Sequence, residues 1–221
     1  MQKAFVAGAT GYTGQEVVQE LLQRGIATIA HVRPDSSKLD FWTEHFKELG
    51  AEVDSTPWDS QSMKSTLISL QPTLVFGLLG TTKKRAAALK TEGGSSTDGS
   101  YEKIDFGYTA LLIDAGEELS TKPRFVYLSS LGVSEKSPGA YMKARWKTEE
   151  YLRKSSLPYT IIQPCFISGN DRQENRPLER MGAIIGDSIL SALSLVGGQK
   201  LQAKYESIDA KTLAHAMVRL G

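Results

Sequence analysis

The chain has 221 residues, of which 40% are hydrophobic, and this length supports one sizeable core over residues 1–221, with room for a small appended lobe. Its 26 basic and 25 acidic residues leave a net charge of +1, which gives no global indication of nucleic acid or an anionic membrane as a partner. The single cysteine, Cys165, excludes an internal disulfide and a cysteine-cluster metal site.

The N-terminal segment reads as a short strand, Phe5–Ala7, followed by three glycines and a helix over roughly 14–24. A side chain at Gly8 or Gly11 would block the approach of a pyrophosphate to backbone amides, and Gly14 lets the helix pack tightly on the strand. The alternative is an ordinary strand–turn–helix connection that uses glycine for its positive φ. We expect a dinucleotide site here, with cofactor-binding residues Gly8, Thr10, Gly11, Tyr12, Thr13 and Gly14.

Strands and helices alternate along the rest of the chain. Apolar runs predict strands at 28–33, 52–53, 73–79, 124–128 and 159–162, and helical patterns fall at 40–49, 60–70, 105–119 and 140–155. Such alternation predicts an α/β fold with a Rossmann-type, doubly wound parallel sheet and right-handed crossovers.

Two polar segments interrupt this pattern. Residues 92–100 are rich in glycine and serine, so we expect a mobile loop, either a lid over the ligand-binding edge or a plain solvent loop. Residues 170–183 are polar and contain proline, and we expect them to open a small C-terminal substrate lobe over roughly 168–200.

The segment after the second strand bears on cofactor choice. A chain that prefers NAD usually carries an acidic residue there, and a chain that prefers NADP offers an arginine to the 2′-phosphate. Here the strand ends in Arg33, with Lys38 as a second cation, although Asp35 argues the other way. We expect NADP rather than NAD as the cofactor. Asp59, beyond the third strand, is placed to accept from the adenine amino group.

Several motifs together resemble those of the atypical short-chain dehydrogenase/reductases, and most closely the NmrA-like and Tat-interacting-protein-like branch. They occur in the family order and cover nearly the whole chain: Gly8-Ala-Thr-Gly-Tyr-Thr-Gly14, Leu78-Leu-Gly-Thr-Thr82, Tyr127-Leu-Ser-Ser130, Tyr141-Met-Lys-Ala-Arg145 and Tyr159-Thr-Ile-Ile-Gln-Pro164. The resemblance implies a Rossmann fold, NADP(H) binding and, in catalytic members, hydride transfer to or from a carbonyl, alcohol or double bond. It also implies cofactor contacts at Leu79, Gly80, Tyr141 and Pro164.

The resemblance further implies three catalytic positions. In such enzymes a tyrosine is the general acid/base, a lysine one helical turn later supports it and holds the nicotinamide ribose, and a hydroxyl polarises the substrate oxygen. Tyr141 matches the tyrosine, Arg145 occupies the lysine position, and Ser130 matches the hydroxyl better than Ser129. Arginine supplies charge and hydrogen bonds but relays no proton, because its pKa lies above about 12.

The remaining reactive side chains predict no second site. Cys165 reads as a buried, inert thiol rather than a group near the nicotinamide. Arginines 172, 176 and 180 recur at a spacing of four and indicate a solvated charged face rather than a site for an acidic substrate. The three histidines lack the spacing of metal ligands, so we expect no metal.

Two functions compete for this chain, and a third is less favoured. The first is an NADPH-dependent oxidoreductase of a small carbonyl or related substrate. The second is an NADP(H) sensor with weak or no catalysis, which would act through a protein partner. An epimerase or dehydratase fits less well because the lobe is small. Since the chain has neither a long apolar run nor a signal peptide, we expect a cytoplasmic monomer or homodimer without a membrane or nucleic-acid partner.

Overall fold

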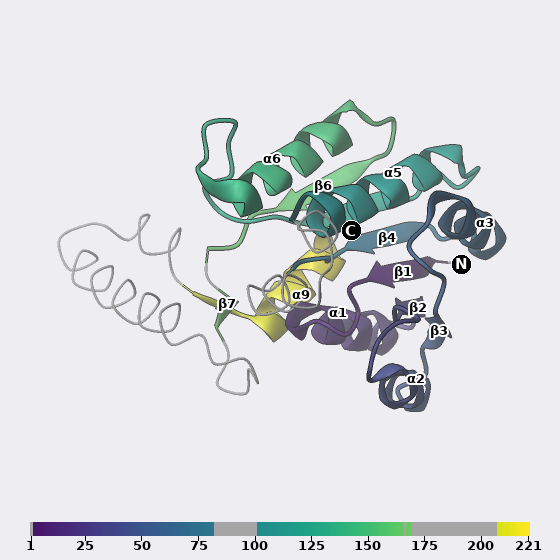
Figure 1. Cartoon of the computed structure of the whole chain (residues 1–221). Helices are drawn as coiled ribbons and strands as arrows, with labels where there is room; N and C mark the ends of the chain where they lie inside the picture. The colour runs from purple at the N-terminus through teal and green to yellow at the C-terminus, as the bar shows by residue number, and fades with distance from the viewer. Residues whose placement is uncertain (1, 82–100, 166, 169–206) are drawn as a thin grey trace.

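The computed structural model describes residues 2–81, 101–165, 167–168 and 207–221. Six parallel strands form one sheet in the order β3-β2-β1-β4-β5-β6 (Figure 1). The strands are β1 (Lys3–Ala7), β2 (Ala27–His31), β3 (Glu52–Asp54), β4 (Leu74–Gly77), β5 (Arg124–Leu128) and β6 (Tyr159–Ile162). The strand order reverses between β1 and β4, as in the Rossmann fold, so the expected α/β sheet is confirmed.

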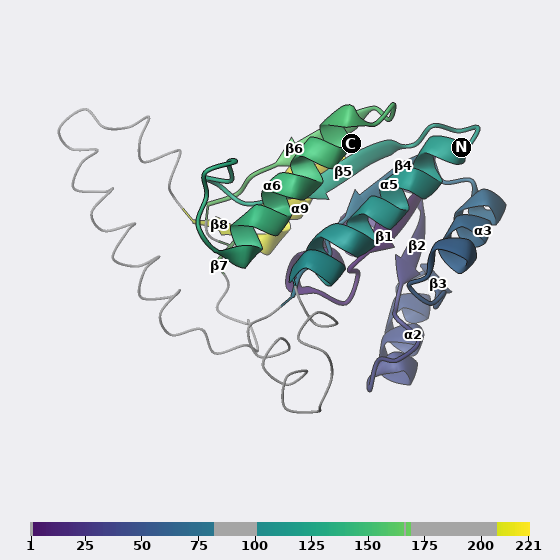
Figure 2. The ribbon, with the colours of Figure 1, turned by 45° about the horizontal axis from the view of Figure 1, so that its top comes forward.

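Helices cover both faces of the sheet (Figures 1 and 2). One face carries α1 (Tyr12–Gln23), α2 (Leu39–Glu48) and α9 (Ala210–Leu220), and the other carries α3 (Ser60–Leu70), α5 (Tyr108–Glu118) and α6 (Gly139–Lys154). Successive side chains of a strand point to opposite faces, so in β1 Val6 packs in the first core and Phe5 in the second. Because both faces are covered, the central strands β1 and β4 are apolar on both sides.

The expected helix over 105–119 begins differently. A π-helical segment, η1 (Glu102–Gly107), comes first and continues directly into α5. Asp105 lies within this segment and is fully buried. A π-helical turn widens the helix locally and occurs often at functional sites.

The C-terminal elements were not anticipated. Strand β7 (Ile167–Ser168) pairs in parallel with β8 (Ile208–Asp209), which leads into α9. The Asp209 side chain caps α9 by accepting a hydrogen bond from the Thr212 amide at 2.9 Å. Leu213 and Met217, on one side of α9, are buried in the core shared with α1.

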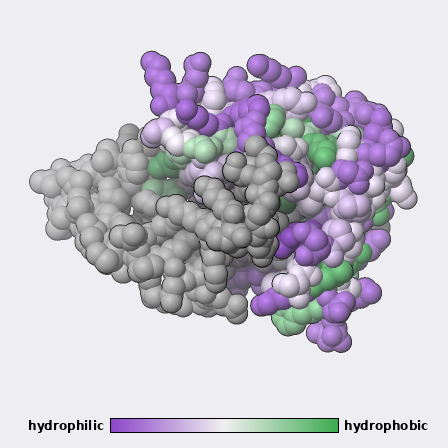
Figure 3. Space-filling model, in the orientation of Figure 1, coloured by the Kyte–Doolittle hydropathy of each residue, from purple (hydrophilic) through white to green (hydrophobic). Residues whose placement is uncertain are grey.

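Several expectations fall outside the described residues: the loop over 92–100, the segment over 170–183, the three arginines 172, 176 and 180, and the lobe over 168–200 except Ser168. Among the helices that the structure describes, none is both long and apolar enough to cross a membrane. Figure 3 shows hydrophilic side chains over much of the described surface in this view, with a smaller apolar area over α2, where Phe41 is exposed.

Candidate functional site

The glycine turn between β1 and α1 has no room for a side chain at Gly8 or Gly14. Gly8 has a φ of +88°, and a Cβ there would lie 2.6 Å from the carbonyl oxygen of Leu78, which follows β4. A Cβ on Gly14 would lie 2.1 Å from the Gly8 carbonyl oxygen, so the expected tight packing of the helix is confirmed. The Gly11 amide donates to the same oxygen at 3.0 Å. The turn therefore brings bare backbone to the end of β1.

The turn points the N-terminus of α1 toward the edge where the parallel strands end. Gly11 is the N-cap residue, Thr10 precedes it in the turn, and Tyr12 and Thr13 begin the helix. A helix N-terminus attracts anions through its amides and its dipole, and a phosphate fits beside a residue without a side chain. The residues present therefore fit the pyrophosphate of a dinucleotide.

The loop after β2 holds the charged residues expected to select the cofactor. Arg33 Nη1 lies 2.7 Å from the Asp35 carboxylate. The Arg33 side chain is partly exposed and the Asp35 side chain is largely exposed. Lys38 is the N-cap residue of α2, and its amide donates to the Ser36 hydroxyl. An arginine and a carboxylate thus share the position that distinguishes NADP from NAD.

Asp59 lies where expected after β3, but its carboxylate caps the N-terminus of the next helix, α3. It is the N-cap of α3 and accepts a hydrogen bond from the Ser62 amide at 2.9 Å, which lowers the pKa of Asp59. The neighbouring Trp58 stacks on Tyr108 at 5.0 Å and contacts the ring of His31 edge-on. A contact between Asp59 and adenine stays a prediction.

Tyr141 and Arg145 lie together on α6. The guanidinium carbon of Arg145 is 5.2 Å from the centroid of the Tyr141 ring, as expected for residues four apart on a helix. Tyr141 is half-buried and also contacts the ring of Tyr101, with 5.5 Å between centroids. A fixed positive charge therefore lies beside the candidate acid.

The guanidinium of Arg145 is buried and joins the ends of two strands. Nη1 donates to the carbonyl of Leu128 at 2.6 Å, at the end of β5, and Nη2 donates to the carbonyl of Leu79 at 3.0 Å, just after β4. Nη2 also lies 3.1 Å from the Asp105 carboxylate, whose other oxygen accepts from the Thr81 amide. Arg145 is thus a structural link as well as a charge.

The surroundings of Arg145 keep it ionised. Burial disfavours its charge, but the nearby phenols of Tyr127 and Tyr141 and the carboxylate of Asp105 more than offset this, so the pKa of Arg145 is raised. Burial also raises the pKa of the Tyr127 phenol, to which Arg145 donates a hydrogen bond. Sequence reasoning missed Asp105, because its only signal was an acidic residue at the start of an expected helix.

The two serines after β5 differ in burial. Ser129 is buried, and its hydroxyl donates to the carboxylate of Glu149 on α6 at 2.5 Å. Ser130 is half-buried. Since Ser129 is turned into the protein, Ser130 remains the candidate for the substrate oxygen, and its catalytic role stays a prediction. No local pattern indicates the contact between Ser129 and Glu149, because it joins residues 20 apart in the chain.

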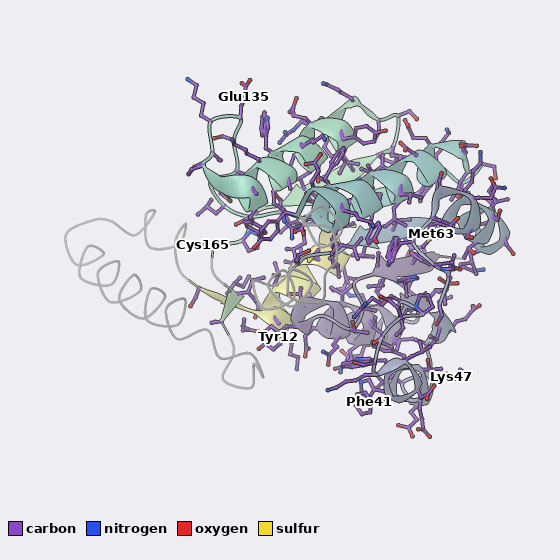
Figure 4. The ribbon with its side chains drawn as sticks, viewed as in Figure 1. Tyr12, Phe41, Lys47, Met63, Glu135 and Cys165 are labelled. Carbon is purple, nitrogen blue, oxygen red and sulfur yellow. The ribbon has the colours of Figure 1, made fainter. Side chains whose placement is uncertain are left out.

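The remaining cofactor candidates follow β4 and β6. A Cβ on Gly80 would lie 3.0 Å from Arg145 Nη2, and the carbonyl of Pro164 accepts from the Leu131 amide at 2.9 Å. Cys165 is half-buried, which corrects the expectation of a buried thiol, because it lies in the segment leaving β6 at the sheet's edge. Figure 4 shows Tyr12 and Cys165 toward the same end of the sheet.

Comparison with known families agrees with this geometry. A family described as NAD(P)H-binding matches residues 8–192, which is more than half of the chain.

Among the described residues, histidine, cysteine, aspartate and glutamate form no group of three that could hold a metal ion.

Curated relatives extend this match. Protein FMP52, mitochondrial, of Candida albicans is 29% identical over 224 residues, covering 97% of this chain and 85% of its own length. Protein TIC 62, chloroplastic, of Arabidopsis thaliana is 29% identical over 182 residues, covering 72% of this chain and 26% of its own length.

Solved structures share the fold. The Bordetella bronchiseptica enzyme WbmH, in complex with NAD+, has a TM-score of 0.64 and 18% identity, with 99% of this chain and 71% of that chain covered. UDP-glucose 4-epimerase of Thermotoga maritima has a TM-score of 0.56 and 20% identity, with 76% and 57% covered. The chain belongs to the NAD(P)H-binding family.

Proposed function

We propose that the chain is an NADP(H)-dependent oxidoreductase acting on a small carbonyl or related substrate. The observation that carries the proposal is the pairing of Tyr141 with the buried cation of Arg145, at the edge where the glycine turn fits a dinucleotide. A proton donor, a fixed charge and a cofactor cradle at one edge are what a carbonyl reduction needs.

Each residue has a distinct task in this proposal. The glycine turn and the N-terminus of α1 hold the pyrophosphate, and Arg33 with Lys38 binds the 2′-phosphate. When bound, NADPH supplies the hydride. Tyr141 gives its phenolic proton to the developing alkoxide while the hydroxyl of Ser130 holds the same oxygen. Arg145 stabilises the phenolate that remains, and water returns the proton because Tyr141 is only half-buried.

The test follows NADPH oxidation with a panel of aldehydes, ketones and quinones. Replacing Tyr141 with phenylalanine removes the proton donor and keeps the ring, so turnover should fall about 100-fold or more. Cofactor affinity, measured in parallel by nicotinamide fluorescence, should fall much less than turnover, because the aromatic ring of residue 141 is kept. Turnover that persists in the Tyr141→Phe protein would remove Tyr141 as the acid.

One observation favours a second candidate function, an NADP(H) sensor that acts through a protein partner. Both terminal nitrogens of Arg145 contact internal acceptors, the carbonyls of Leu79 and Leu128 and the Asp105 carboxylate. A guanidinium held this way supports binding without relaying protons. Cofactor binding with no turnover on the whole panel, in the native chain and in Arg145→Lys, would favour this candidate.

The proposals for location and assembly rest on the sequence. A cytoplasmic location stays a prediction, because the relatives FMP52 and TIC 62 are named as mitochondrial and chloroplastic proteins. Assembly as a monomer or homodimer also stays a prediction.

A further inference from the structure

Glu149 is a buried carboxylate that the proposed chemistry does not use. It lies on α6, one helical turn beyond Arg145 and two beyond Tyr141, and it is fully buried. Residues four apart share a helix face, so all three project from one side of α6. A carboxylate is seldom buried unless each oxygen has a partner.

Both oxygens of Glu149 have partners, and one oxygen bridges two strands. Oε1 accepts from the Ser129 hydroxyl at 2.5 Å and from Nε2 of Gln163 at 2.8 Å. Oε2 accepts from the Arg153 guanidinium at 2.6 Å. Ser129 is the first residue after β5 and Gln163 is the first after β6. The carboxylate thus fixes the ends of two neighbouring strands to α6.

The anchored residues immediately precede two candidate site residues. Ser130 follows Ser129, and Pro164 follows Gln163. Backbone bonds hold the two segments side by side, since the Ser129 amide donates to the carbonyl of Ile162 at 2.8 Å. Hydrogen bonds to a buried carboxylate are strong, so loss of Glu149 would loosen both segments together.

The location of these segments assigns them to one half of the cofactor. A Rossmann sheet consists of two mononucleotide-binding halves, and a dinucleotide lies across both. The glycine turn and Arg33 belong to the half built on β1, β2 and β3, where the adenosine phosphates are expected. Ser129 and Gln163 belong to the half built on β4, β5 and β6. We propose that Glu149 is a positioning residue that holds the nicotinamide half of the site, an inference that rests on the proposed function.

The experiment compares the whole cofactor with its adenosine half. NADPH and NADH are titrated by nicotinamide fluorescence, and 2′,5′-ADP and ADP by calorimetry. In Glu149→Leu and in Gln163→Leu, we expect the preferred dinucleotide to bind about five- to tenfold more weakly, as loss of a buried hydrogen bond implies. Its adenosine half should bind as tightly as it does to the native protein. Gln163→Leu removes one bond at the edge strand and tests the role if Glu149→Leu fails to fold.

Two matched variants separate positioning from stability. Arg153→Met removes the partner of Oε2, together with the contacts of Arg153 to Glu150 and Trp146, but keeps both bonds to Oε1, so both affinities should stay unchanged. Glu149→Gln keeps an acceptor oxygen for Ser129 and Gln163, and should recover most of the affinity lost in Glu149→Leu. Equal losses for the dinucleotide and its adenosine half would overturn the role of Glu149, as would a loss in Arg153→Met as large as that in Gln163→Leu.

The remaining outcomes distinguish this role from the proposed function. A native protein that binds neither NADPH nor NADH overturns the proposed function and the role of Glu149 with it. The role of Glu149 alone is overturned by a different result. In that case the native protein binds the dinucleotide and reduces the test carbonyls, and Glu149→Leu and Gln163→Leu bind the dinucleotide as tightly as the native protein does.

Discussion

The Arg33 guanidinium has a carboxylate partner within its own loop, the side chain of Asp35 at 2.7 Å. The pair is exposed to solvent, where such a contact contributes at most about 1 kcal/mol to stability. A 2′-phosphate carries more charge and accepts hydrogen bonds at several oxygens, so it competes well for the same guanidinium. Asp35 in turn can accept from the ribose 2′-hydroxyl of NAD. We therefore expect the two residues to favour different cofactors, Arg33 favouring NADP and Asp35 favouring NAD.

Replacing each residue of the pair tests this competition. Arg33→Ala should weaken NADPH binding by about 1–3 kcal/mol and leave NADH binding nearly unchanged, because only NADPH carries the 2′-phosphate. Asp35→Asn should strengthen NADPH binding, because it removes the competing carboxylate. Fluorescence titration with both cofactors measures each effect. Equal losses for NADPH and NADH in Arg33→Ala would contradict the assignment.

At the scale of elements, the sequence predicted the helices and strands whose ends are marked by neighbouring residues. The strand over 124–128, the strand over 159–162 and the helix over 60–70 have the expected bounds, because each apolar or helical run ends at a breaker. The π-helical start of α5 has no such local signal, and Asp105 within it accepts a hydrogen bond from the Thr81 amide, 24 residues away. Helix α9 likewise takes its place by packing against α1, at the other end of the chain.

Helix α9 offers a matched pair of substitutions. Met217→Ala should lower the free energy of unfolding by about 2–5 kcal/mol, because the side chain is fully buried in the core shared with α1. Leu220→Ala, three residues later, should change it by less than about 0.5 kcal/mol, because Leu220 is 58% exposed. Urea denaturation measures both. Similar values for the two variants would contradict the packing of α9 on α1.

For the whole molecule, the sequence predicted the fold and the edge that carries the site, but less of the site's internal geometry. The three glycines and the alternation of strands and helices were enough to predict the fold and this edge, because both patterns depend on spacing along the chain. Asp105 and Glu149 were not identified, since a buried charge owes its place to partners that are distant in sequence. Arg145 was located correctly beside Tyr141, but its contacts with two strand ends were not foreseen.

Stability of the whole molecule should depend on pH through His31. This ring is buried at the end of β2, and burial lowers its pKa below the ordinary value of 6.5, although a hydrogen bond to the Thr56 carbonyl and the charge of Asp54 oppose the shift. Above that value both folded and unfolded chains hold a neutral ring. As the pH falls below it, the unfolded chain takes up a proton that the folded chain resists, so stability is lost on the acid side.

The expected result is a free energy of unfolding that declines from pH 7 toward pH 5, and declines less steeply in His31→Gln, whose amide can still donate to Thr56. Urea denaturation at several pH values measures both slopes. Identical slopes in the two proteins would show that His31 does not titrate in this way.

The contacts of Arg145 also bear on how the chain folds. Its acceptors at Leu79, Asp105 and Leu128 come from segments up to 66 residues away, and each is in place only when β4, η1, β5 and α6 have docked. Closing such loops costs entropy before any contact forms, so distant contacts tend to assemble late. A partly folded chain can therefore have the glycine turn in place before Arg145 and Tyr141 reach their final positions. In that case only the fully folded chain would bind both halves of the dinucleotide.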